Sequence, residues 1–148
     1  MILAACLAVF LSAPSVARAE AWSPRVTEVT GDVLLFAAGS EEGLPVEAGT
    51  PLEDGDRLET ADDGRAELAM EADSVVELGP KTSFTMGSTK KEDSWFSVDL
   101  GSFLAKLKSM AESRRRFAVR TPTAVCAVRG TEFGVEVGDD GDTMVGVF

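Results

Sequence analysis

The stretch FAVRTPTAVCAVRGTEFGVEV, residues 117–137, decides the fold of this chain. Apolar residues alternate with other residues on both sides of a Thr-Pro break, and a period of two is the pattern of a β-strand. Pro122 cannot donate a hydrogen bond to a strand ladder and favours an extended residue before it, so it marks a strand edge or a corner between strands. Gly130 allows backbone angles that residues with a β-carbon resist. The stretch therefore predicts short strands joined by turns.

Alternating segments of the same kind recur along the chain from residue 26 onward. Residues 26–36 predict a strand interrupted by Gly-Asp, and residues 37–45 predict a loop. Two Asp-Gly turns flank a further strand, because such dipeptides tolerate the left-handed angles of tight hairpins. The remaining predicted strands are 57–60, 65–70, 73–78, 82–86, 93–100 and, after an acidic turn, 143–148. Strands at this spacing with turns between them are typical of an all-β domain.

The segment after residue 100 fits two patterns. Gly101 is expected to interrupt the preceding strand, in which Trp95, Ser97 and Asp99 alternate with apolar residues. A helical spacing fits Phe103, Leu104, Leu107, Met110 and Ala111, whereas a strand spacing fits Phe103, Ala105 and Leu107. Periodicity alone does not decide between them. Residues 112–116 are polar and predict a loop.

Residues 1–19 have the features of a secretory signal peptide that is cut after Ala19. The segment is apolar and ends in the small-residue triplet Ala-Arg-Ala, although no Lys or Arg precedes its apolar part. Pro14 and Arg18 limit a competing membrane span to about 16 residues, whereas roughly 20 are needed. We therefore expect a periplasmic or secreted protein, with a linker at 20–25, one domain at 26–148 that is incomplete at its C-terminus, and membrane contact only through an uncleaved leader.

The charge of the chain argues against nucleic acid as a partner. It has 25 acidic residues against 14 lysines and arginines, for a net charge of −11. Loss of Arg18 with the leader would remove one positive charge and give −12. Nucleic-acid binding needs a basic face. The basic clusters at 90–91 and 114–116 are interpreted as solvated turns.

No pattern in the sequence predicts a catalytic or cofactor site. The chain has no histidine, the commonest general base and metal ligand. Most paired carboxylates stand beside glycines, where turn formation explains them. A calcium site at Asp139, Asp140 and Asp142 is the functional alternative, although the ligand spacing of a calcium loop is absent. Cys126, the single cysteine after the leader, stands among apolar residues and is interpreted as a small buried thiol. We expect no enzyme activity, no cofactor and no resident metal.

Two further groups of residues are candidate recognition elements. Arg129, Gly130 and Thr131 form a candidate recognition turn, with a purely structural role as the preferred interpretation. Trp22 and Trp95 could form a platform for a sugar, but core packing is the preferred interpretation for both.

Three motifs in order make the chain resemble the FecR-like domain, named for the periplasmic regulator of ferric citrate uptake. They are GTPLEDGDRLET at 49–60, GRAEL at 64–68, and the segment 117–133 with its TP, VRGT and final Phe. The resemblance runs from about Val26 to Phe148. It implies short antiparallel strands in a flattened sandwich-like or β-helix-like stack, and a strand over 102–110. It brings no catalytic residue. Sensor-regulator members begin with a cytoplasmic anti-sigma segment, whereas residues 1–19 here predict a leader.

These observations predict an exported, non-enzymatic protein that binds a protein partner in envelope signalling or assembly, through an exposed strand edge or an acidic loop. The alternative is a module that binds a small ligand or a cell-wall glycan, with calcium as a possible aid. A hydrolase that uses the acidic residues of the last turn is the third hypothesis.

Overall fold

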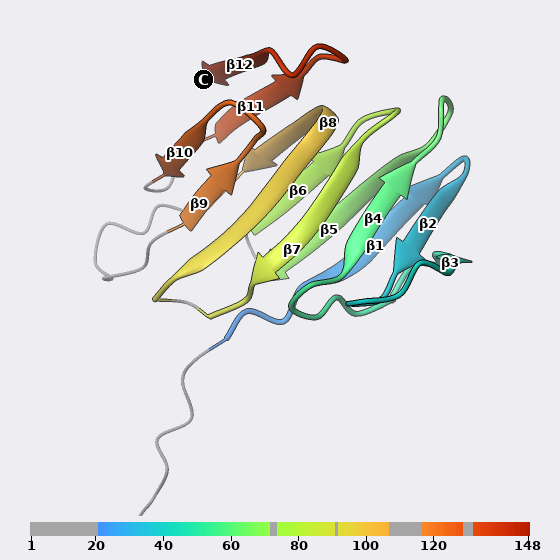
Figure 1. Ribbon diagram of the computed structural model, residues 1–148. Helices are drawn as coiled ribbons and strands as arrows, with labels where there is room; N and C mark the ends of the chain where they lie inside the picture. The colour runs from blue at the N-terminus through green and yellow to red at the C-terminus, as the bar shows by residue number, and fades with distance from the viewer. Residues whose placement is uncertain (1–20, 72–73, 91, 107–116, 129–131) are drawn as a thin grey trace, which may run out of the picture.

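The computed structural model describes residues 21–71, 74–90, 92–106, 117–128 and 132–148. These residues form an all-β structure in which no helix occurs (Figure 1), so the predicted fold class is confirmed. The strands are β1 (Arg25–Thr30), β2 (Val33–Phe36), β3 (Gly43–Pro45), β4 (Arg57–Thr60), β5 (Arg65–Glu71), β6 (Ser74–Leu78), β7 (Ser83–Ser88), β8 (Ser94–Lys106), β9 (Phe117–Arg120), β10 (Val125–Val128), β11 (Glu132–Val137) and β12 (Thr143–Val147).

The described strands belong to one curled sheet whose two halves face each other as layers (Figure 1). The first layer holds, in spatial order, β3, β2, β4, β7, the first half of β8, β9 and β10. The second layer holds β1, β5, β6, the second half of β8, β11 and β12. Neighbouring strands are antiparallel except β8 and β9, which are parallel. The long strand β8 therefore joins both layers.

Strand β8 passes from one layer to the other at Gly101. The prediction that this glycine interrupts the strand was wrong, because β8 continues through it to Lys106. Gly101 has φ +93°, and a β-carbon there would lie 2.3 Å from Thr82 Oγ1. Only glycine tolerates both the left-handed backbone and the close approach. Gly101 therefore bends the strand instead of ending it.

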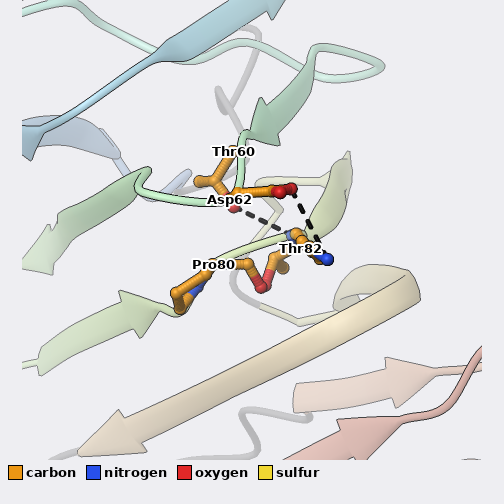
Figure 2. Close-up of polar contacts among 5 residues, drawn as sticks. Thr60, Asp62, Pro80 and Thr82 are labelled. Atoms are coloured by element: carbon orange, nitrogen blue, oxygen red, sulfur yellow. Dashed lines mark hydrogen bonds and ion pairs between the residues drawn. The ribbon is translucent and has the colours of Figure 1, made fainter.

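Buried threonines fix the turns beside this bend (Figure 2). The Thr60 hydroxyl donates to the Gly79 carbonyl at 2.7 Å. It accepts from the Thr82 amide at 2.8 Å, as Figure 2 shows. The Thr82 hydroxyl in turn accepts from the Ser102 amide at 3.1 Å. Since buried polar groups are costly unless they are hydrogen-bonded, these contacts link β4, the β6–β7 turn and β8. The nearby ion pair from Lys81 to Asp62, 3.6 Å long, is exposed and contributes little.

The core between the layers contains a cluster of phenylalanine rings. The ring of Phe96 on β8 lies 5.0 Å from Phe84, 5.1 Å from Phe103 and 4.6 Å from Phe117, between ring centroids. Phe103 also contacts Phe133 on β11, at 5.6 Å. Edge-on and tilted geometries of this kind are favourable for aromatic pairs. The alternation seen in the sequence thus places one side of each strand in a shared core.

Several segment predictions can be compared with the structure. The predicted loop at 37–45 ends in the short strand β3, because Gly43–Pro45 pairs with β2. The strand reading of the segment after Gly101 is confirmed up to Lys106. Pro122 lies in the turn between β9 and β10, which confirms the predicted corner. The segment expected to be a linker packs against the domain from Trp22, which is only 5% exposed. The leader at 1–19 and residues 107–116 lie outside the described residues.

Candidate interaction surfaces

The candidate recognition turn, Arg129, Gly130 and Thr131, lies outside the described residues. It follows β10 and precedes β11. Glu132, the first residue of β11, lies 3.6 Å from Lys106 Nζ, so this carboxylate forms an exposed ion pair with the neighbouring strand.

The acidic turn residues act as hydrogen-bond acceptors for the backbone. Asp56 is buried and its carboxylate accepts from the amides of Ala38 at 3.0 Å and Glu53 at 2.9 Å. Asp54 accepts from the Thr89 amide at 2.7 Å. Carboxylates that accept from backbone N–H groups stabilise turns and loops. Asp56 thus stabilises the turn in which it lies, as predicted, whereas Asp54 contacts a distant loop.

The turn before β12 holds the residues considered for calcium. Asp140 accepts from the Asp142 amide at 3.1 Å, and Gly141 adopts φ +84°. Among the residues that the structure describes, no group of three or more His, Cys, Asp or Glu side chains is placed to hold a metal ion. The geometry of this turn gives no support to the calcium alternative.

Exposed apolar side chains gather on two strands at one end of the sandwich. Strands β10 and β12 lie at the ends of their layers and near each other (Figure 1). Most of the exposed large apolar side chains of the described residues belong to these strands or to the adjoining Phe148; they are Val125, Met144, Val145, Val147 and Phe148, with Leu34 and Leu44 elsewhere. We call these five residues the apolar edge. β12 contains no charged residue.

Within the described residues, the core is least covered at this end. Val145 and Val147 pair with Val135 and Phe133, so they lie on the core side of the second layer. Their partners are 2% and 1% exposed, but Val145 is 43% and Val147 is 70% exposed. Because the apolar side chains of a core strand are normally covered, the sheet presents a partly uncovered core face here.

Threonine hydroxyls connect the two edge strands at one end. The hydroxyl of Thr143 on β12 lies 2.8 Å from those of Thr121 and Thr123, in the turn that precedes β10. The Thr123 hydroxyl also donates to the Gly141 carbonyl at 2.9 Å. These contacts hold the two strand edges in fixed relative positions.

Cys126 lies on the inner side of β10, opposite Val119. It is partly buried and packs against the core. The thiol therefore belongs to the margin of this least covered end and not to the fully buried centre.

The two tryptophans lie in different environments. Trp22 is in the core, as expected. Trp95 lies on the outer face of β8, where it is partly exposed and Arg120 stacks on it, so the core interpretation was wrong for this residue. The two rings do not form a common platform.

Comparison with known proteins decides the family. The family model described as FecR protein matches residues 56–148. The chain belongs to the FecR protein family. No curated protein and no solved structure matches the chain. The FecR family indicates a signalling-related domain.

The FecR match covers β4 to β12, and the earlier strands complete the same sheet. β1 pairs with β5, and β2 pairs with β4, both antiparallel. The structural unit of this FecR domain therefore begins before the matched segment. Among the described residues, none forms a helix long and apolar enough to cross a membrane.

The outer face of the second layer has a hollow that sequence reasoning missed. It encloses about 340 Å³, and its lining includes Glu28, Arg65, Glu67, Glu77 and Ser102. The register aligns Glu28 with Glu67 and Glu67 with Glu77 on neighbouring strands. Local patterns mark each glutamate as exposed, but only the strand pairing brings the three together.

Proposed function

We propose that this FecR-family chain is an exported, non-enzymatic domain that binds a protein partner in envelope signalling or assembly. The observation that supports the proposal best is the apolar edge on β10 and β12. Exposed apolar side chains on an uncharged edge strand are typical of an interaction site, because soluble proteins otherwise cover or charge such edges.

The proposed mode of binding is strand addition to β12. The free backbone groups of an edge strand pair with an extended segment, and the alternate side chains of that segment give specificity. Here the inward side chains of the added strand would cover Val145 and Val147. The charged residues next to β12 are Glu132, Glu136 and the aspartates of the preceding turn. A segment with apolar alternate residues and basic flanks complements this edge.

The absence of histidine from the sequence supports a non-enzymatic role. The buried carboxylate of Asp56 is engaged by backbone amides, which explains it without acid–base chemistry. Export is proposed from the apolar, small-residue character of residues 1–19.

A pull-down from periplasmic extract with the exported chain tests this function. Val147→Lys places a charge on the apolar edge, and Leu44→Lys places the same charge on β3, at another exposed apolar position. We expect the wild type and Leu44→Lys to retain one and the same protein, and Val147→Lys to lose it. Failure of the wild type to retain a protein, or equal retention by both variants, would contradict the proposal.

A second candidate, a module that binds a small ligand or a wall glycan, is favoured by the hollow on the second layer. A ligand that binds the native state raises the melting temperature. Thermal-shift measurements with muropeptides, on the wild type and on Glu67→Gln, test it. A shift in the wild type that is lost in the variant would support this candidate, and no shift would exclude these ligands.

A further inference from the structure

Two arginines on the outer face of the first layer are held on aromatic rings. The guanidinium carbon of Arg57 lies 4.5 Å from the centroid of Phe36, and that of Arg120 lies 4.0 Å from the centroid of Trp95. The Trp95 ring lies flat against Gly87, where a β-carbon would be 2.3 Å from ring atoms. Stacking of this kind restricts a long side chain and lowers the entropy lost when it binds a ligand.

The strand register places these arginines in one row. Arg57 on β4 pairs with Thr85 on β7, Thr85 with Ser97 on β8, and Ser97 with Arg120 on β9. Both sequence neighbours of Arg57, Thr85 and Ser97 are buried, and so is Val119 before Arg120, so all four side chains share the outer face. Adjacent strands lie about 4.8 Å apart, which puts the Cα atoms of the two arginines about 14 Å apart.

The guanidinium groups retain capacity for a carboxylate ligand. Among the described residues, Arg120 forms no ion pair. Arg57 lies 3.2 Å from Glu59, but both side chains are about two-fifths exposed and the pair is weak. Asp99 shares the outer face of β8. The aligned glutamates of the hollow lie on the opposite face of the molecule, with Arg65 beside them.

We propose that this row binds an extended acidic segment of a protein partner, with carboxylates at positions i and i+4 and a small residue between them. An extended chain advances about 3.3–3.4 Å per residue, so four residues span about 13–14 Å and place both carboxylates on the same side. This length matches the separation of Arg57 and Arg120. Each guanidinium can bind a carboxylate with two parallel hydrogen bonds. The hydroxyls of Thr85 and Ser97 face the middle of the segment.

The proposal concerns a different face from the apolar edge and stands independently of the function proposed above. Two carboxylates on a flexible peptide suffice to test it. The probe is the peptide GEGSGEG, titrated into the ¹⁵N-labelled chain and followed by NMR. One control peptide has both glutamates replaced by glutamine, and another has them three residues apart, on opposite sides of an extended chain.

We expect GEGSGEG to shift the Trp95 indole and Ser97 amide signals, and both control peptides to bind more weakly. Because contacts between exposed charged groups are modest, Arg57→Gln and Arg120→Gln should each weaken binding about two- to fivefold. Arg65→Gln, the matched control on the second layer, should leave it unchanged. Glu59→Gln removes a competing carboxylate and should strengthen binding. Val147→Lys should have no effect, which separates this site from the apolar edge.

Three results would overturn the proposal. The first is no shift with GEGSGEG, or an equal shift with the glutamine peptide. The second is equal loss of binding in Arg120→Gln and Arg65→Gln. The third is a preference for an oligomer of uronic acids over the peptide, which would assign the row to an acidic polysaccharide. Circular dichroism of each variant confirms that the fold is retained.

Discussion

Truncation of Phe96 to alanine should destabilise the domain more than a typical substitution. The ring is fully buried, and it contacts Phe84 on β7, Phe103 on β8 and Phe117 on β9. These neighbours stand on strands held in register by backbone hydrogen bonds, so they cannot collapse fully into the space left by the ring. The cost therefore includes lost burial and a residual cavity.

The expected magnitude follows from these contacts. Replacement of a buried phenylalanine by alanine costs about 3–5 kcal/mol, and we expect about 4 kcal/mol here because three aromatic contacts are lost together. For a domain of about 150 residues, each 1 kcal/mol lowers the melting temperature by about 2–4 °C. Phe96→Ala should therefore lower it by about 8–16 °C.

Urea unfolding followed by tryptophan fluorescence measures this change. Ser97→Ala is the matched control, because Ser97 lies beside Phe96 on the same strand but on the outer face. Substitutions on the outer face, away from the core, usually change stability by no more than about 0.5 kcal/mol. A loss below about 1.5 kcal/mol in Phe96→Ala, or similar losses in both variants, would refute a core centred on this ring.

Three further substitutions test the turns and the bend. Gly101→Ala should cost about 2 kcal/mol or more, because residue 101 has a left-handed backbone and its new β-carbon would collide with Thr82. A free energy of unfolding that changes by less than about 0.5 kcal/mol would contradict the bend at Gly101. Thr60→Val removes a hydroxyl that donates to the partly buried Gly79 carbonyl and accepts from the buried Thr82 amide. It should cost about 1–3 kcal/mol in urea unfolding, and an unchanged free energy of unfolding would contradict this role. Asp56→Ala leaves the amides of Ala38 and Glu53 without their acceptor and should cost about 1–3 kcal/mol, whereas Asp56→Asn should cost less. A lower melting temperature for Asp56→Asn than for Asp56→Ala would contradict these hydrogen bonds.

Local patterns were sufficient to predict the strands, but not which strands distant in the sequence lie next to each other. The alternation in residues 117–137 and the Asp-Gly turns predicted the strands because burial on one face imposes a period of two. Gly101 was misread because a glycine that bends a strand and one that ends it look alike in sequence. The difference lies in the contact with Thr82, which comes from another strand.

For the candidate surfaces, too, local patterns predict the exposure of single residues but not which residues come together. Trp95 shares its strand face with the polar residues Ser97 and Asp99, and this alternation indicates that the ring lies outside the core. The large apolar side chain of Trp95 favours a core position instead, and the prediction based on it was wrong. The row from Arg57 to Arg120 could not be found from the sequence, because it depends on the pairing of four strands. The apolar edge depends on which strands lie at the ends of the layers, which the local pattern does not specify.

Amide hydrogen exchange tests the central claim, that the apolar edge is the surface on which a protein partner docks. The chain is compared alone and in complex with the partner retained in the pull-down. Strand addition predicts slower exchange at residues 143–148, with smaller changes at 125–128 and none on β3. Unchanged exchange at 143–148 together with protection on another surface would contradict it.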